Sequence, residues 1–236
     1  MKLKNITTFD FKDLRRFKKV FCLVSGGIDS TYLLEMCEKY LDNVFPVNAF
    51  NPYEQSKALK LIMKNPKFIQ VKPDERYIYG DILKEAFLKI PEAMAAKRVG
   101  KYHKKIFPCC YYIKHKAFLK DSVFQEKGTV VISGIKYGDG QQRRFWLRKL
   151  WKEKRFYHEH KSGQLYCYPF RDFKQRELPD DIIEQLREKY EDLDHSGCAL
   201  CPVLVVFDIK SEGKRYVDSM RYAHKLLGRR EIGDLK

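Results

Sequence analysis

Short apolar runs alternate with longer amphipathic stretches along most of the chain. The apolar runs predict buried strands at Lys19–Val24, Val44–Val47, Lys67–Val71, Val130–Gly134 and Tyr166–Phe170. The amphipathic stretches predict helices at Ser30–Tyr40, Glu54–Met63, Ile82–Ile90, Arg143–Arg155, Asp180–Tyr190 and Lys214–Leu227. Strands that alternate with helices form parallel sheets. We therefore expect an α/β fold with a parallel sheet, helices on both of its faces and a single domain.

Two segments lie outside this alternation. The stretch Pro91–Pro108 is polar and basic, and we expect it to be a mobile loop. The last predicted helix ends at Gly228, a residue that commonly terminates helices. We expect residues 1–207 to form the α/β domain, and residues 208–236 to form a C-terminal helix and tail.

Composition adds a strong positive charge to this picture. The 236 residues are 44% hydrophobic and 14% aromatic, which argues against disorder, and the formal net charge is +16. No long apolar run is present, and Met1–Phe17 has no signal-peptide pattern, so we expect a cytoplasmic protein without a membrane partner. The charge favours polyanionic ligands, either nucleotide phosphates or nucleic acid, although it also fits a purely solubilising role.

The loop between the first predicted strand and helix has the sequence SGGIDS. Gly26 and Gly27 let backbone N–H groups approach phosphate oxygens, and the helix that follows adds a partial positive charge. Ser25 and Ser30 offer hydroxyl groups to the same oxygens, and Asp29 could hold the helix N-terminus or help to place Mg²⁺. The alternative is an ordinary tight turn with an aspartate cap.

This loop resembles the SGGxDS signature of the PP-loop ATP pyrophosphatases, which split ATP into AMP and pyrophosphate by adenylating a substrate. It is unlike a Walker A loop, because the terminal Gly-Lys-Ser/Thr is missing. The resemblance implies a Rossmann-like fold of the adenine nucleotide alpha hydrolase type. It also implies that ATP binds at Ser25–Ser30 and that Asp29 takes part in catalysis.

Four of the seven cysteines suggest a metal site. Cys109 and Cys110 are adjacent, and Cys198 and Cys201 form a CxxC, so four thiolates could converge if the fold joins the two segments. Four thiols suit an iron–sulfur cluster or zinc, and the absence of any metal is the third possibility. The remaining three are expected to be small core residues, namely Cys22, Cys37 and Cys167.

The order of a cysteine pair, a long gap and a CxxC resembles the [4Fe-4S] site of the APS/PAPS reductase family. Lys114 adds to this resemblance, because that family carries a lysine four residues after the pair, close to the cluster. Gly134-Ile135-Lys136 followed by Arg143 is similar to the family's GxR…R substrate loop, with Lys136 in place of the first arginine. The resemblance implies that Lys136 and Arg143 grip phosphate or sulfate oxygens, and a solvated charged loop is the alternative.

The sequence departs from a true reductase in two respects, the position of its last cysteine and its intact SGGxDS loop. Those enzymes attack sulfonyl sulfur with a C-terminal cysteine thiolate, whereas the last cysteine here is Cys201. The intact SGGxDS loop favours a closer analogy with the pyrophosphatases of DNA phosphorothioation and the tRNA thiolases. We therefore expect an AMP-forming enzyme that adenylates a substrate for sulfur transfer onto nucleic acid, with a sulfur-donor protein as a possible partner. A reductase that takes its thiol from a partner and a nucleotide-binding docking subunit are the alternatives.

The basic helix predicted at Arg143–Arg155 is the candidate nucleic-acid contact. Helical spacing puts four cations on one side, namely Arg144, Arg148, Lys152 and Arg155, and three apolar residues on the other, namely Leu147, Leu150 and Trp151. The aromatic side chains of Phe145 and Trp146 could stack on a base. A solvated amphipathic helix is the alternative. We expect His158 and His160 to lie at the surface, and His195 to lie either beside the cluster or in a loop. Asn48 and Asn51–Glu54 are expected to lie near the adenine or ribose of a bound nucleotide.

Overall fold

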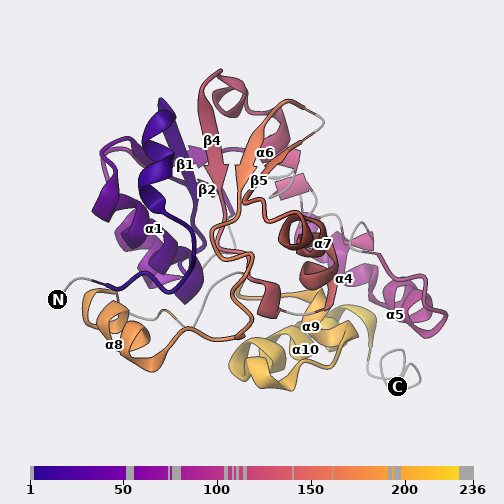
Figure 1. Cartoon of the computed structure of the whole chain (residues 1–236). Helices are drawn as coiled ribbons and strands as arrows, with labels where there is room; N and C mark the ends of the chain where they lie inside the picture. Colours follow the sequence, from indigo (N-terminus) through magenta and orange to yellow (C-terminus); the bar gives the residue numbers. More distant parts are fainter. Residues whose placement is uncertain are drawn as a thin grey trace. The chain divides into compact units, whose positions relative to one another are not determined.

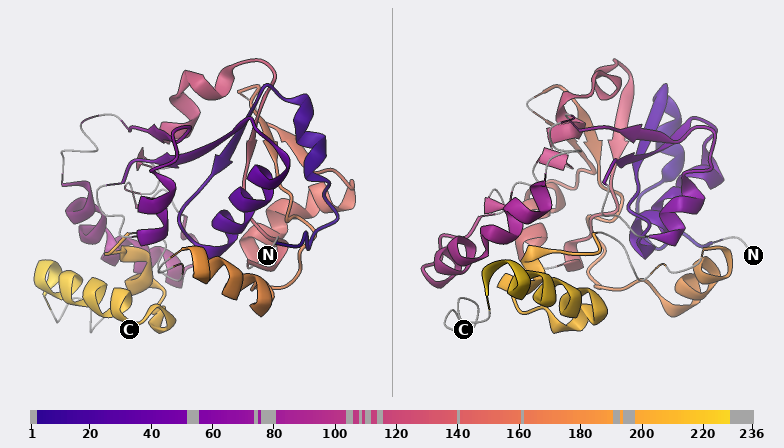
Figure 2. Two further views of the ribbon diagram at one scale, coloured as in Figure 1. Left: turned by 90° about the vertical axis from the view of Figure 1, so that its left-hand side faces the viewer. Right: turned by 180° about the vertical axis from the view of Figure 1, so that it is seen from behind.

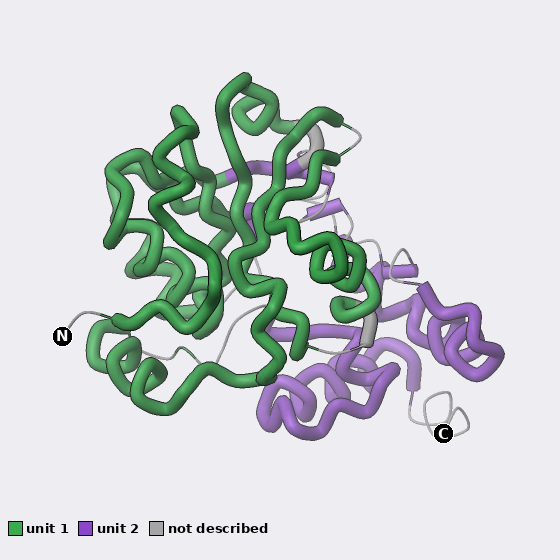
Figure 3. The backbone as a smooth tube through the Cα atoms, viewed as in Figure 1, with its two compact units in different colours: residues 1–48, 56–70, 121–196 green, residues 49–55, 71–120, 197–236 purple. Residues whose placement is uncertain are grey.

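The computed structural model describes residues 3–51, 56–73, 75, 81–103, 106–107, 109, 112–113, 116–139, 141–160, 162–190, 193 and 198–228. The chain divides into two compact units, shown in Figure 3. Unit 1 comprises residues 1–48, 56–70 and 121–196, and unit 2 comprises residues 49–55, 71–120 and 197–236. The boundary expected at residue 207 stays a prediction.

The strands of the described residues form one sheet of six in the order β3-β2-β1-β4-β6-β5. Their bounds are β1 Lys19–Leu23, β2 Val44–Ala49, β3 Ile69–Val71, β4 Thr129–Ile132, β5 Tyr157–Glu159 and β6 Leu165–Cys167. β1 pairs in parallel with β2 and β4, and β4 pairs in parallel with β6. The predicted α/β class is confirmed, and the sheet is mostly parallel.

One edge of the sheet is antiparallel, which corrects the expectation of a fully parallel sheet. β5 pairs with β6 in antiparallel register, with His158 opposite Tyr166. The turn that joins them is too short for the crossover that parallel strands need. No strand is predicted here from the sequence, because β5 is only three residues long and two of them, His158 and Glu159, are exposed.

The predicted helices all have counterparts in the structure. All the helices described in unit 1, predicted or not, are η1 Phe11–Arg16, α1 Ile28–Tyr40, α2 Lys57–Ile62, η4 Ser122–Gln125, η5 Tyr137–Asp139, α7 Gln141–Lys152 and α8 Asp180–Lys189. Those in unit 2 are α4 Ile82–Leu88, α5 Ile90–Arg98, α6 Ala117–Lys120, α9 Pro202–Val206, η6 Lys210–Glu212 and α10 Lys214–Leu227. α10 ends at Gly228, as expected.

The prediction of a mobile loop at Pro91–Pro108 was wrong over its first half, which is α5. Pro91 lies in the first turn of this helix, where its missing N–H costs no hydrogen bond. Ile90, Ala93 and Met94 are buried on one side, and the lysine and arginine lie at the C-terminal end, where cations favour a helix. The helix was not predicted because the basic residues that follow its short apolar face make the whole stretch look polar.

The main core of unit 1 lies on one face of its strands. Val20 and Cys22 of β1 and Ile132 of β4 point to this face and pack with residues of η1, α1 and α8. Figures 1 and 2 show α1 on this side of the strands. The core positions expected for three cysteines are confirmed, since Cys22, Cys37 and Cys167 are all fully buried in this cluster.

The opposite face of the same strands is covered by other elements. Phe21 of β1 packs edge-on against Phe124 of η4, with ring centroids 5.0 Å apart. Beyond β4, α7 buries Leu147 and Leu150 in a cluster with Tyr168. Helices therefore cover both faces of the sheet, as the alternating pattern predicted.

Unit 2 has its own hydrophobic core. α4 and α5 contribute residues such as Phe87, Ile90 and Met94, and α9 contributes Val205 and Val206. α10 adds Ala223 and Tyr222, whose ring meets that of Phe87 edge-on at 4.8 Å. Within the described parts of both units, no helix has the length and apolar character needed to cross a membrane.

Candidate nucleotide site and cysteine segments

The strand order places two loops of unit 1 at the same edge of the sheet. β1, β2 and β3 follow one another outward in one direction, and β4 then lies on the other side of β1. The order reverses between β1 and β4, which are parallel, so the loops that follow them leave the sheet at the same end. In open α/β sheets this reversal is where ligands bind. The loop after β1 contains Ser25–Ser30, and the loop after β4 leads to Lys136 and Arg143.

The loop after β1 depends on a glycine at position 26. Gly26 has a φ of +76°, and a Cβ there would lie 2.0 Å from Oγ of Ser56. Only glycine can occupy this position without moving Ser56, the residue whose side chain caps α2. The backbone therefore passes close to α2 before it turns into α1.

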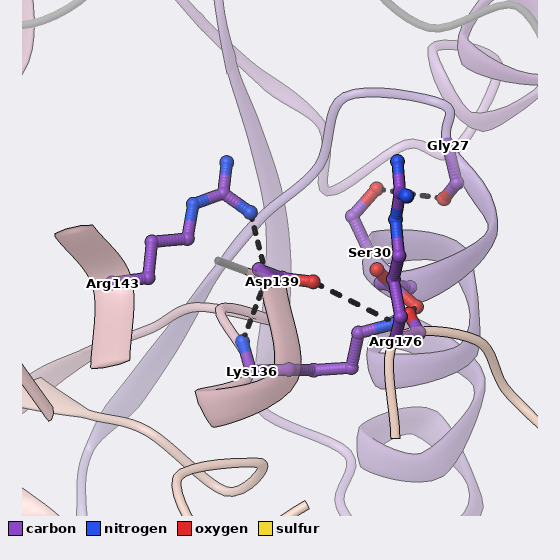
Figure 4. A network of polar contacts seen from close by, with 7 residues as sticks. Gly27, Ser30, Lys136, Asp139, Arg143 and Arg176 are labelled. Atoms are coloured by element: carbon purple, nitrogen blue, oxygen red, sulfur yellow. Dashed lines mark hydrogen bonds and ion pairs between the residues drawn. The ribbon is translucent and has the colours of Figure 1, made fainter. Parts of the chain in front are cut away.

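The two serines of the loop bond to each other and to the backbone. Oγ of Ser30 accepts a hydrogen bond from the N–H of Ser25 at 3.1 Å and donates one to the carbonyl oxygen of Gly27 at 3.0 Å. Oγ of Ser25 lies 3.1 Å from Oγ of Ser30. These contacts hold the loop in a closed turn at the start of α1, and Figure 4 shows the bond between Ser30 and Gly27.

The N-terminus of α1 is suited to an anion. Gly27 is the N-cap, and no side chain makes a capping hydrogen bond there. The first N–H groups of an α-helix have no carbonyl partner within the helix, and the helix dipole makes this end positive. Asp29 therefore does not act as the cap that the sequence allowed for. A phosphate at this position would bond to the N–H groups that no side chain covers.

Lys136 joins the two loops through a buried ion pair. Its Nζ lies 2.6 Å from Oδ1 of Asp29 and 2.6 Å from the carbonyl oxygen of Arg176, and it is 3.9 Å from Oδ1 of Asp139. The Lys136 side chain is only 2% exposed, whereas that of Asp29 is 34% exposed. Burial raises the pKa of Asp29, and the ammonium of Lys136 acts in the opposite direction. All three N–H groups of Lys136 thus have oxygen atoms of the protein nearby.

Asp139 connects Lys136 to Arg143. Its Oδ2 accepts a hydrogen bond from the backbone N–H of Lys136 at 2.9 Å and another from Nη1 of Arg143 at 2.6 Å. Figure 4 shows Asp139 between these two residues. The Arg143 side chain is 54% exposed, so its guanidinium can bind an anion while it keeps one hydrogen bond to Asp139.

Two glycines allow the backbones around this network to approach closely. A Cβ at Gly134 would lie 3.1 Å from the carbonyl oxygen of Asp29, which places the end of β4 against the start of α1. A Cβ at Gly138 would lie 2.3 Å from the carbonyl oxygen of Gln175. The N–H of Gly138 also donates to the carbonyl oxygen of Phe173 at 3.2 Å. Three segments of unit 1 therefore meet at this site: residues 25–30, residues 133–139 with Arg143, and residues 173–176.

The predicted adenine contacts are only partly described. Asn48, at the end of β2, donates from Nδ2 to the carbonyl oxygen of Val24 at 2.5 Å and so ties the ends of β2 and β1 together. Pro52, Tyr53 and Glu54 lie outside the described residues. Asn51 belongs to unit 2, where it contacts a cysteine.

Three of the four candidate metal ligands are described, and all three belong to unit 2. Cys109 is buried in the core cluster that also contains Val205, and Leu200, between the other two cysteines, packs against this cluster. The fold thus brings the segments of Cys109 and of the CxxC into one core. Cys110, Lys114 and His195 lie outside the described residues.

The surroundings of the CxxC are polar. Nδ2 of Asn51 donates to Sγ of Cys198 at 3.0 Å, and Nε of Arg215 donates to the carbonyl oxygen of Cys198 at 3.2 Å. The backbone N–H of Cys201 donates to Oγ of Ser219 at 2.9 Å. Hydrogen bonds to the sulfur atoms are a feature of iron–sulfur sites, so the donor chemistry fits a metal cluster. Among the described side chains, however, no three of the types His, Cys, Asp and Glu are grouped closely enough to hold one metal ion.

Several residues of the site were not identified from the sequence. Asp139 lies in a Gly-Asp-Gly sequence but was not named as a site residue, and nothing marked the carbonyl of Arg176 or the side chain of Ser56 as parts of the site. A sequence does not show which backbone carbonyl oxygen will accept a hydrogen bond from a distant side chain. The aspartate could have been found from its position between two glycines in the loop that follows a central strand.

Comparisons with known proteins add one distant similarity. No protein-family model matches the sequence, and no curated protein does. Among 27 solved chains that match is the U34-tRNA thiolase NcsA from Methanococcus maripaludis with its [4Fe-4S] cluster. The two chains are 19% identical, the match covers 92% of this chain and 74% of that one, and the TM-score is 0.45. A similarity at this level is too low to assign a function.

Proposed function

We propose that unit 1 binds ATP at Ser25–Ser30 and transfers its adenylyl group to a substrate, with release of pyrophosphate. The observation that carries this proposal is the meeting of the Gly26 loop, the N-terminus of α1 and the cations Lys136 and Arg143 at the reversal point of the sheet. A neutral ligand would gain nothing from a helix N-terminus and an exposed guanidinium. A polyphosphate would bind to both.

Each residue has a distinct part in this reaction. The N–H groups at the start of α1 and the hydroxyls of Ser25 and Ser30 bind the phosphates that leave as pyrophosphate. Arg143 stabilises the negative charge that develops on the leaving group, because its guanidinium is exposed and held by Asp139. Lys136 keeps the Asp29 carboxylate in place, and the exposed part of Asp29 is available to Mg²⁺ bound to the phosphates.

The finer proposal is that adenylation prepares a nucleic acid for sulfur insertion. The adenylated oxygen leaves as AMP when sulfur replaces it, and a sulfur-donor protein supplies that sulfur. Support comes from the formal net charge of +16 and from the basic α7, which carries Arg143 itself. The four cysteines Cys109, Cys110, Cys198 and Cys201 are the proposed ligands of a [4Fe-4S] cluster. A cluster with an iron free of cysteine would hold the sulfur, whereas a cluster with all four irons bound by these cysteines would serve as a structural or electrostatic element.

One experiment separates this function from a sulfonucleotide reductase. Anaerobically purified protein is incubated with labelled ATP and Mg²⁺ in the presence of tRNA or DNA, and separately with APS or PAPS and a thiol donor. The proposal expects pyrophosphate and AMP from ATP and no sulfite from the sulfonucleotides. Sulfite release without cleavage of ATP would replace the proposal with the reductase. The absence of both products would favour a docking subunit without catalysis.

A further inference from the structure

An unbroken row of aromatic rings crosses the edge of unit 1 where α7 lies on the β5–β6 hairpin. The ring of Trp146 meets that of Tyr168 at 4.8 Å and that of His158 at 6.4 Å, both edge-on. Tyr168 stacks on Tyr166 at 6.3 Å, and Tyr166 meets His160 at 6.3 Å. The sequence marked the two histidines only as surface residues.

The hairpin explains why these rings lie together. Side chains alternate between the two faces of a strand, and Cys167 points into the main core on the α1 side. His158 and its cross-strand partner Tyr166 therefore point to the other face, where α7 packs. Tyr168, which is buried, forms the base of the row, and Trp146 is 45% exposed above it.

α7 surrounds this row with positive charge. The helix QQRRFWLRKLWK contains five cations and no acid, and the cations are Arg143, Arg144, Arg148, Lys149 and Lys152. All five side chains are exposed. Asp139 and Glu153 are the acids nearest in sequence; Asp139 pairs with Arg143, and Glu153 pairs with Arg155. The helix therefore presents a field that attracts an anion.

Phe145 is the residue of this surface that distinguishes between possible ligands. It lies between Arg144 and Trp146 and is 80% exposed, whereas Leu147 and Leu150 hold the helix to the sheet. A phenylalanine in water contributes nothing to the packing of unit 1. An exposed aromatic ring next to cations is the arrangement that binds the bases and phosphates of an unpaired strand.

We propose that α7 and the β5–β6 hairpin bind a single-stranded segment of nucleic acid, with bases on Phe145 and Trp146 and phosphates on Arg148 and Lys152. For the choice of partner this inference rests on the proposed function. In a duplex the faces of the bases are covered by neighbouring base pairs, so a duplex would contact the cations of α7 but could not stack on Phe145 or Trp146. An acidic peptide would likewise use the cations but leave Phe145 without a partner.

The test measures binding of fluorescent single-stranded RNA, single-stranded DNA and duplex to the full chain by anisotropy at several salt concentrations. Phe145→Ala is expected to weaken single-strand binding about 5- to 100-fold, and Phe145→Tyr to preserve it. Phe145→Leu keeps the apolar side chain without the ring and is expected to behave like the alanine variant. Because Phe145 is so exposed, these variants leave the fold intact, which circular dichroism checks.

The cations are tested separately by their salt dependence. Arg148→Gln combined with Lys152→Gln is expected to reduce the slope of log affinity against log salt by about 1.4 for a single strand. Lys60→Gln combined with Lys64→Gln, on exposed positions at and just after α2, removes the same charge and is expected to leave the slope nearly unchanged.

Equal affinity for duplex and single strands, or equal affinity of wild type and Phe145→Ala, would overturn the proposal. Pyrophosphate release from ATP is measured in the same preparations. If ATP is cleaved but no nucleic acid binds, this inference fails and the proposed function stands. If single strands bind but ATP is not cleaved, the surface stands and the proposed function fails. A difference between RNA and DNA identifies which of the two is the source of the strand.

Discussion

Nζ of Lys136 lies 2.6 Å from Oδ1 of Asp29, and the lysine side chain is almost completely buried. The two residues are far apart in the sequence, and the pair links the loop after β4 to the first turn of α1. The resemblance to reductases implies that Lys136 grips a phosphate directly. In the structure its N–H groups face Asp29, Arg176 and Asp139. We infer that Lys136 positions Asp29, and that Arg143 is the cation that meets the anion.

Replacing Lys136 with Met is expected to destabilise unit 1 by about 2–4 kcal/mol, because the Asp29 carboxylate loses its buried partner. Urea denaturation measures this change. The double variant Lys136→Met with Asp29→Asn is expected to recover part of the loss, since no unpaired charge remains. Lys189→Met is the control: it removes an ion pair of equal length between Lys189 and Glu35, in which the lysine side chain is 57% exposed. This variant is expected to lose less than about 1 kcal/mol of stability. Similar losses in the two single variants would contradict the role of burial.

Gly26→Ala is expected to destabilise the protein by roughly 2–4 kcal/mol and to weaken ATP binding. The alanine would have a positive φ, and its Cβ would collide with Ser56. Gly163→Ala is the control, because Gly163 has a φ of +80° but no atom within 4 Å of the added Cβ. It carries only the backbone strain of about 1–2 kcal/mol. Thermal unfolding measures the loss of stability, and calorimetric titration measures the loss of ATP affinity. Equal losses of stability in the two variants would show that the side chain of Ser56 moves away from the new Cβ without cost.

Arg143→Gln is expected to reduce pyrophosphate release about 10- to 1000-fold with little change in stability. The side chain is exposed, and its charge is most useful when the leaving group becomes more negative. Arg144→Gln, one position further along α7, removes the same charge and is the matched control for the reaction. Initial rates at saturating ATP compare the two. A similar decrease in both would point to a general loss of positive charge and against a specific contact.

The anaerobically prepared protein is expected to be brown and to contain about four irons per chain, bound by Cys109, Cys110, Cys198 and Cys201. Cys198→Ser and Cys201→Ser should lose the visible absorption and most of the iron. Cys22→Ala, in the core of unit 1, should retain both. Iron and acid-labile sulfide are assayed together, and stoichiometric zinc without sulfide would establish the zinc alternative.

Stability is expected to fall as the pH rises above about 8.5, the ordinary pKa of a thiol. Burial raises the pKa of Cys37 and of Cys167, so both thiols stay protonated in the folded protein. The unfolded chain loses these protons at its ordinary pKa, so the stabilisation is complete below that pH and declines above it, by up to about 1.4 kcal/mol per pH unit for each thiol. Urea midpoints between pH 7 and 9.5 measure this trend, and Cys167→Ala should reduce the slope.

The sequence alone determined the strands and helices of the nucleotide loop region and the alternation that makes an α/β sheet. These follow from local periodicity: β1, the Gly26 turn and α1 are contiguous, so their hydrophobic spacing and glycines define them. It also singled out Asp29, Lys136 and Arg143, and the segments of Cys109 and the CxxC, as places where chemistry concentrates.

Only the tertiary structure decided what these residues contact. The burial of Lys136 against Asp29 depends on a parallel pairing of β1 with β4 that no local pattern encodes. The ring row from His158 to His160 depends on β5, a strand too short to show a period, folding back beneath α7. Periodicity reports which face of an element is apolar. The partner of that face is set by long-range packing, which a single sequence does not record.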